Sequence, residues 1–237
     1  MLTLRDLSVD YPGFAGRYTL SVPTGGLCAI VGPSGGGKTT LLSAIAGFEP
    51  ISGGSLEVGG TSILDLPPAR RPVTVLFQDY NLFPHLTVLQ NVGLGLRPDL
   101  RLAPADTRRA EEALASVDLA GMGPRRPATL SGGERQRAAL ARALVMERPV
   151  LLLDEAFGPL DPGLRLEMLG LVDRLRRARG LTVVMSIHTP EDVVGVADSV
   201  AFVESGRVLL QDTPEAVFGS ELEPVRRFMG RRGGQRH

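Results

Sequence analysis

Residues 32–39 read Gly-Pro-Ser-Gly-Gly-Gly-Lys-Thr, and they are the strongest indication of the fold in the sequence. An apolar run precedes it at 27–31, and apolar residues at helical spacing follow it at Leu41, Leu42 and Ile45. Glycines let the backbone turn so tightly that successive N–H groups point at one anion, and the start of a helix adds a favourable dipole. A strand, a glycine-rich loop and a helix in this order predict a phosphate-binding loop. Its expected phosphate-binding residues are Gly32, Pro33, Ser34, Gly35, Gly36, Gly37, Lys38, Thr39 and Thr40.

In a loop of this kind the lysine contacts the β- and γ-phosphates of a nucleotide, and the hydroxyl that follows it binds Mg²⁺. Lys38 and Thr39 take these places, so ATP and Mg²⁺ are the expected cofactors. Lys38 is also the only lysine of the chain, and every other long cation is arginine. A compact ammonium fits a phosphate cage that a planar guanidinium does not fit. The alternative, a chance glycine-rich turn, is disfavoured by the strand and helix on either side.

The composition describes a globular chain of 237 residues with 43% apolar residues, long enough to bury a substantial core. The 26 basic and 26 acidic residues balance, so nothing indicates a nucleic-acid partner. The single cysteine, Cys28, lies in the apolar run before the loop and is expected to be a small buried hydrophobe. No run approaches the ~18 apolar residues of a membrane span, and no signal-peptide pattern opens the chain. If the protein serves a membrane, the spanning part is expected to be another chain.

Two kinds of periodicity alternate along the chain. Short apolar runs predict strands at 2–11, 18–22, 27–31, 55–58, 72–77, 150–153, 181–187, 199–203 and 207–211. Helical spacing dominates 78–148, and further helices are expected to begin at 161, 189 and 213. We therefore predict one α/β domain with a core at 1–77 and 149–218, a helical sub-domain inserted at about 78–148, and a tail at 219–237 that is mobile from Arg226.

A second motif joins an apolar strand at 151–153 to two carboxylates, Asp154 and Glu155. Ligands of open α/β sheets bind at the carboxyl ends of the strands, which brings both acids close to the phosphates. Neighbouring strand residues point to opposite faces, so the two acids need not share a role. We expect Asp154 to orient Mg²⁺ and Glu155 to polarise an attacking water as the general base. Alone, the pair is also compatible with an acidic cap of the next element.

A third motif, Ser131-Gly132-Gly133-Glu134, opens a long helix. The serine and the glutamate form a capping-box pattern. Two glycines in a first turn weaken a helix, by about 1 kcal/mol each relative to alanine in a helix interior. In exchange, the two glycines are expected to let the exposed N–H groups come close to an anion. This helix start is therefore predicted to bind a second anion, and the capping box can be present at the same time.

These motifs, in this order, resemble the ATP-binding subunits of ABC transporters from residue 2 to about 218. The resemblance implies a P-loop NTPase (RecA-like) fold with a parallel-sheet core, an N-terminal antiparallel β part and the inserted helical sub-domain. It also implies that Tyr11 stacks on adenine, a role for which Tyr18 competes. Ser131, Gly132 and Gly133 would close over ATP bound to a second, head-to-tail copy. Asp161 would contact that copy, His188 would grip the γ-phosphate, and Gln78 would contact Mg²⁺ and the attacking water.

The resemblance further implies partners. They are a second ATPase subunit, transmembrane permease subunits and, through these, a periplasmic or extracellular solute-binding protein, with this chain peripheral on the cytoplasmic face of the inner membrane. Phe83 and the residues after it are expected to dock a permease helix, or else to pack inside the helical sub-domain. Ala156 and Thr189 depart from the residues usual at these places in the family, without removing a catalytic group.

The stretch 71–100 resembles the ATPases of bacterial thiamine importers, and ferric-iron, sulfate and polyamine importers share parts of it. The expected function is therefore ATP hydrolysis that drives an importer, most specifically for thiamine. The alternative from another class is a soluble P-loop ATPase or kinase, which would need neither the Ser131 helix start nor self-association.

Overall fold

The computed structural model describes residues 1–77 and 82–230. Within these ranges, ten strands form one sheet in the order β5-β4-β1-β2-β10-β9-β3-β8-β7-β6. Its parallel part consists of β9 (Ser199–Glu204), β3 (Leu27–Val31), β8 (Thr182–Ser186), β7 (Val150–Asp154) and β6 (Val73–Phe77). Every residue of β3, β7 and β8 is buried, as expected of central parallel strands with both faces covered.

The N-terminal part of the sheet is antiparallel. It consists of β1 (Leu2–Tyr11), β2 (Phe14–Val22), β4 (Gly53–Val58) and β5 (Thr61–Ser62). β10 (Arg207–Asp212) forms a hairpin with β9 and reaches β2 through one parallel pair, Arg207 with Arg17. β2 begins four residues before the predicted start at Tyr18, because it pairs with β1 up to the turn, where Tyr11 lies opposite Phe14.

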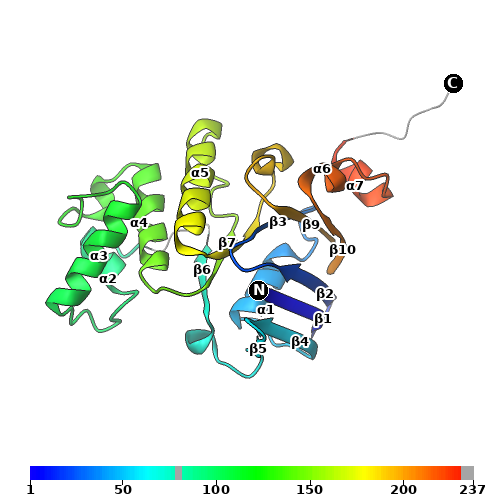
Figure 1. The fold of residues 1–237 in the computed structure, drawn as a ribbon, viewed down its shortest axis with the longest axis horizontal. Helices are drawn as coiled ribbons and strands as arrows, with labels where there is room; N and C mark the ends of the chain where they lie inside the picture. The colour runs from blue at the N-terminus through cyan, green and yellow to red at the C-terminus, as the bar shows by residue number, and fades with distance from the viewer. Residues whose placement is uncertain (78–81, 231–237) are drawn as a thin grey trace.

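Helices complete the α/β architecture (Figure 1). They are α1 (Lys38–Ala46), α2 (Val88–Gly93), α3 (Pro104–Ser116), α4 (Gly132–Leu144), α5 (Pro162–Arg179), α6 (Pro214–Phe218) and α7 (Glu223–Phe228), with short 3₁₀ segments η1 (Pro68–Arg70), η2 (Pro127–Thr129) and η3 (Pro190–Val193). Figure 1 shows α2, α3 and α4 gathered at one end of the molecule and the antiparallel strands at the other, with α5 between them. The predicted fold class is thereby confirmed. None of the helices in the described part of the chain is both long and apolar enough to cross a membrane.

Two local expectations differ from the structure. The helix expected after Thr189 is only the four-residue η3, and Gly195 follows soon after it with a φ of 85° that no continuing helix adopts. The segment expected to be mobile from Arg226 begins inside α7, because the apolar side chains of this helix find partners. Val225 is 1% exposed, and the Phe228 ring lies 5.5 Å from that of Phe202. Residues 231–237 of the tail lie outside the described ranges.

Candidate functional site

The glycine-rich loop joins β3 to α1 at the carboxyl end of the parallel strands. Gly32 has a φ of 145°, and a Cβ at this position would lie 1.9 Å from the carbonyl oxygen of Val203. Gly37, the N-cap of α1, has a φ of 101°, and a Cβ there would lie 2.6 Å from the Tyr18 hydroxyl. That hydroxyl donates a 2.9 Å hydrogen bond to the Gly37 carbonyl. Both positions therefore require glycine, and Tyr18 is buried beneath the loop rather than free to stack on a ligand.

Lys38 is the first residue of α1 and is only 4% exposed. Its Nζ donates to the carbonyl oxygens of Gly32 and Pro33 at 2.9 and 3.0 Å, so the ammonium lies across the loop. Burial lowers the pKa of Lys38, while the nearby carboxylates of Glu155 and Asp154 act in the opposite direction. A desolvated cation held in this way is a strong partner for a phosphate group.

Asp154 ends β7 and is 8% exposed. Its Oδ1 accepts hydrogen bonds from the Thr39 hydroxyl at 3.3 Å and from the Ser186 hydroxyl at 2.7 Å. A hydroxyl and a carboxylate at this separation form the set of oxygen donors that Mg²⁺ prefers beside phosphates. Thr39 and Asp154 therefore fit a magnesium site.

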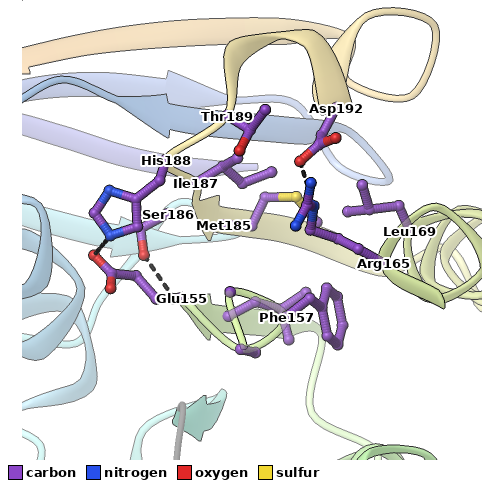
Figure 2. A pocket seen from close by; sticks show the side chains of 13 residues that line it. Glu155, Phe157, Arg165, Leu169, Met185, Ser186, Ile187, His188, Thr189 and Asp192 are labelled. Carbon is purple, nitrogen blue, oxygen red and sulfur yellow. Dashed lines mark hydrogen bonds and ion pairs between the residues drawn. The ribbon is translucent and has the colours of Figure 1, made fainter. Parts of the chain in front are cut away.

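Glu155 directly follows β7 and has a φ of 48°, in the left-handed region that few non-glycine residues adopt. Its backbone N–H donates to the Ser186 hydroxyl at 2.9 Å. Its Oε1 lies 2.6 Å from Nε2 of His188, as Figure 2 shows. A carboxylate that contacts an imidazole at the edge of a phosphate loop can accept a proton from water while the imidazole holds it in place.

Lys38, Thr39, Glu155 and His188 face one cleft of about 340 Å³, whereas Asp154 does not line it but bonds to Thr39, which does. Its lining combines an aromatic edge, the glycine-rich loop and the Glu155–His188 pair, and comprises Tyr11, Phe14, Ser34, Gly35, Gly37, Lys38, Thr39, Thr40, Glu155 and His188. Tyr11 is 41% exposed, and its ring stacks on that of Phe14 with centroids 5.0 Å apart. The cleft thus offers an aromatic surface at one side and cationic and N–H groups at the other, which suits a nucleotide.

The Ser131 helix start does not line this cleft. Ser131 caps α4: its hydroxyl accepts from the N–H of Glu134 at 3.2 Å, and its own N–H donates to the Glu134 carboxylate at 2.7 Å. A Cβ on Gly133 would lie 2.9 Å from the Leu164 side chain, so packing against α5 is one reason for this glycine, whereas a Cβ on Gly132 would meet nothing within 4 Å. The capping box is present, and the Gly132 position is open to a partner.

Two further predicted residues lie elsewhere. Asp161 is the N-cap of α5, and its carboxylate accepts from the N–H of Leu164 at 3.0 Å. It does not line the cleft. Gln78 lies outside the described residues.

Sequence reasoning missed three features of the site. Phe14 lines the cleft beside Tyr11, and Ser186 bonds to both carboxylate residues. The third is Arg165 on α5, whose Nε donates to Asp192 at 2.5 Å and whose Nη1 donates to the Leu160 carbonyl at 3.2 Å. This pair lines a second, smaller cavity of about 90 Å³, which Glu155 and His188 also line (Figure 2). None of the three has a local sequence signal, because each depends on contacts between distant segments.

Comparison with known proteins shows the family of this chain. The family model described as ABC transporter matches residues 16–158. The thiamine import ATP-binding protein ThiQ of Brucella suis is 47% identical over 230 residues, 97% of this chain and 95% of that protein. ThiQ of Rhizobium meliloti is 44% identical over 233 residues, 98% of each chain.

Solved structures of the same family superpose well. The cbiO1 protein of Clostridium perfringens, described as part of the ABC transporter complex cbiONQ, gives a TM-score of 0.82 at 28% identity, covering 93% of this chain and 91% of that one. The ATP-binding cassette MJ0796, solved as a dimer bound to ADP and phosphate, gives a TM-score of 0.75 at 28% identity, covering 90% and 99%. Because the family model covers residues 16–158 and the relatives match nearly the full length, the chain belongs to the ABC transporter family of ATP-binding proteins.

Proposed function

We propose that this chain is the ATP-hydrolysing, energy-coupling subunit of a bacterial thiamine importer. Thiamine as the transported substrate is supported by the 44–47% identity to thiamine import ATP-binding proteins along nearly the full length of both chains. ATP-binding proteins of ABC transporters hydrolyse ATP to drive transport. The cleft supports this activity because it places a phosphate loop beside a carboxylate–imidazole pair.

The roles of the residues follow from their positions. The N–H groups of residues 34–39 would bind the phosphates, and Lys38 would neutralise charge on the β- and γ-phosphates. Thr39 and Asp154 would hold Mg²⁺. The positive charge of the ion would offset the negative charge that develops on the phosphate oxygens during hydrolysis. Glu155 would accept the proton of the attacking water, and His188, 2.6 Å away, would orient Glu155 and contact the γ-phosphate. Tyr11, at the exposed edge of the cleft, would stack on adenine.

A second copy would complete the site. Ser131, Gly132, Gly133 and Asp161 do not line the cleft of their own chain. In a head-to-tail dimer, the start of α4 would close over ATP bound to the loop of the other subunit, with Asp161 at the contact between subunits. That the cassette MJ0796 was solved as a dimer supports a second copy as partner. Gln78, between β6 and the helical region, would contact Mg²⁺ and the attacking water.

The other proposed partners are the transmembrane permease and, through it, a solute-binding protein. Phe83 is 46% exposed and, with Leu86, would dock a helix of the transmembrane permease. The subunit would thus be peripheral on the cytoplasmic face of the inner membrane, and a solute-binding protein would act on the permease from outside. The relative cbiO1 is itself part of a transporter complex, which supports a permease partner.

The decisive experiment co-purifies the chain with its permease and solute-binding protein and measures ATP hydrolysis against thiamine, ferric iron, sulfate and a polyamine. Stimulation by thiamine alone is expected. Stimulation by another solute would reject thiamine and keep the importer, whereas steady hydrolysis that no solute changes would favour a soluble ATPase or kinase.

A variant tests the hydrolytic roles separately. Glu155→Gln is expected to bind ATP, to dimerise and to hydrolyse ATP at least about 100-fold more slowly, because the amide cannot accept the proton. Glu111→Gln, on the exposed face of α3, makes the same chemical change outside the cleft and serves as control. Normal turnover by Glu155→Gln would reject the assignment of the general base.

A further inference from the structure

Ser186 ends β8 directly opposite Asp154, with which it pairs in the parallel register of β7 and β8. Its side chain is 3% exposed and makes two hydrogen bonds at once. The hydroxyl donates to Oδ1 of Asp154 at 2.7 Å and accepts from the backbone N–H of Glu155 at 2.9 Å. Both partners are residues to which the proposed function gives a role in hydrolysis. We propose that Ser186 is a positioning residue that holds the Mg²⁺-binding carboxylate and the general base in one arrangement, an inference that rests on those roles.

The first bond fixes the Asp154 carboxylate. Oδ1 of Asp154 receives the Ser186 hydroxyl from β8 and the Thr39 hydroxyl from α1. Two donors from different elements that meet on one oxygen leave the carboxylate little freedom to rotate about its Cβ–Cγ bond. The orientation of Asp154 toward Thr39 is therefore set before any nucleotide or metal arrives.

The second bond fixes the backbone of Glu155. Successive side chains of a strand point to opposite faces, so a regular continuation of β7 would turn Glu155 away from the side that Asp154 faces. The φ of 48° at Glu155 breaks this alternation, in a backbone conformation that is costly for a residue with a side chain. The N–H of Glu155 is tied to Ser186 at this same turn, and the side chain then meets His188 at 2.6 Å. Figure 2 shows the three side chains of Glu155, Ser186 and His188 at one edge of the cavity.

Both bonds meet on one atom, Oγ of Ser186, and a hydroxyl suits this place because the same oxygen can donate to a carboxylate and accept from an N–H. Ser186→Ala removes both bonds, whereas Ser186→Thr keeps them. A matched control exists at the other end of the same strand. Thr182 is also 3% exposed and also accepts from one backbone N–H, that of Gly25, and donates to one carbonyl, that of Pro23. Thr182→Val thus removes an equally buried hydroxyl far from the phosphate loop.

The first measurement needs neither nucleotide nor metal. Amide hydrogen exchange of Glu155, followed by NMR in the nucleotide-free chain, is expected to be slow in the parent and at least about tenfold faster in Ser186→Ala. Thr182→Val should leave the exchange of this amide unchanged. Equal protection of the Glu155 amide in parent and Ser186→Ala would overturn the proposal.

The second measurement is steady-state ATP hydrolysis by the same variants. Ser186→Ala is expected to lower kcat about tenfold with the KM for ATP within twofold, since loop and lysine are intact, and Ser186→Thr is expected to restore kcat to within about threefold. Thr182→Val should lower the unfolding temperature but not kcat. If the parent hydrolyses ATP and Ser186→Ala does so within twofold, this inference alone fails. If the parent does not hydrolyse ATP, the proposed function fails with it.

Discussion

The ion pair between Arg165 and Asp192 provides a quantitative test of how α5 is joined to the segment that carries His188. The Arg165 Nε lies 2.5 Å from Oδ2 of Asp192, and the two side chains are only 18% and 10% exposed. The same guanidinium holds the carbonyl of Leu160, next to the α5 N-cap. Arg165 thus links the first turn of α5 to Asp192 in η3, and Asp192 lies four residues after His188.

The expected energies follow from this burial. Charges about 4 Å apart attract by roughly 4 kcal/mol at an effective dielectric constant near 20, and desolvation offsets part of this. Removing either partner leaves a largely buried charge without its counterion, so Arg165→Met and Asp192→Asn should each lower the free energy of unfolding by about 3 kcal/mol. The double variant should lose about 4 kcal/mol, which gives a coupling energy of about 2 kcal/mol.

Urea unfolding of the parent, the two single variants and the double variant, followed by circular dichroism, measures this coupling energy. The exposed pair Arg109–Glu147, with side chains 41% and 68% exposed and 3.0 Å apart, serves as a control cycle with an expected coupling below about 1 kcal/mol. If the effects of Arg165→Met and Asp192→Asn add to within about 0.5 kcal/mol, the pair is not coupled and the argument from burial is wrong.

Three further predictions concern the loop, the buried thiol and the α4 cap. Gly32→Ala should lower stability by about 3 kcal/mol, measured by urea unfolding, because its Cβ would lie 1.9 Å from the Val203 carbonyl oxygen at a φ of 145°; an unchanged midpoint would contradict the loop geometry. Burial raises the pKa of the Cys28 thiol to about 11, so a thiol reagent at pH 8 should label the native chain at least about 100-fold more slowly than the urea-unfolded chain; rapid native labelling would show that β3 is accessible. The bond from the backbone N–H of Ser131 lowers the pKa of Glu134, so the stability that its charge contributes is complete above pH 4.5, its ordinary pKa, and is lost as the pH falls through the lower folded value. The stability difference between the parent and Glu134→Gln should accordingly be constant from pH 6 to 8 and shrink in acid, and a difference that grows in acid would reverse the sign of this argument.

Much of this architecture is readable from the sequence, because its main signals are local. The glycine loop between an apolar strand and a helix predicts both the turn and the anion site, and the structure shows why Gly32 and Gly37 leave no room for a Cβ. The capping box at Ser131 is likewise a pattern within four residues, and the structure contains both of its hydrogen bonds.

Other features depend on which distant strands become neighbours. Asp154 and Ser186 meet because β7 pairs with β8 in one register, and a serine at the end of an apolar run gives no sign of that pairing. Phe14 stacks on Tyr11 only because the β1–β2 hairpin places them opposite each other. Likewise, α7 lies in a segment rich in arginine, and its buried Val225 and partly buried Phe228 matter only because α7 packs against the sheet near Phe202. Such contacts arise from the tertiary fold and override local composition.

Lys38 gives this protein an unusual chemical property. The 237 residues carry two primary amines, the amine of Met1 and the ε-amine of the single lysine. The first lies at an exposed chain end, and the second lies across the phosphate loop, hydrogen-bonded to its carbonyl oxygens. Acylating reagents, aldehydes and enzymatic lysine modification therefore have one side-chain target in these 237 residues, and it is the residue proposed to hold the nucleotide. Attachment to a surface or a dye through amines is accordingly expected at the N-terminus, because Lys38 is only 4% exposed, and a reagent that does reach Lys38 would modify the residue proposed to hold the nucleotide.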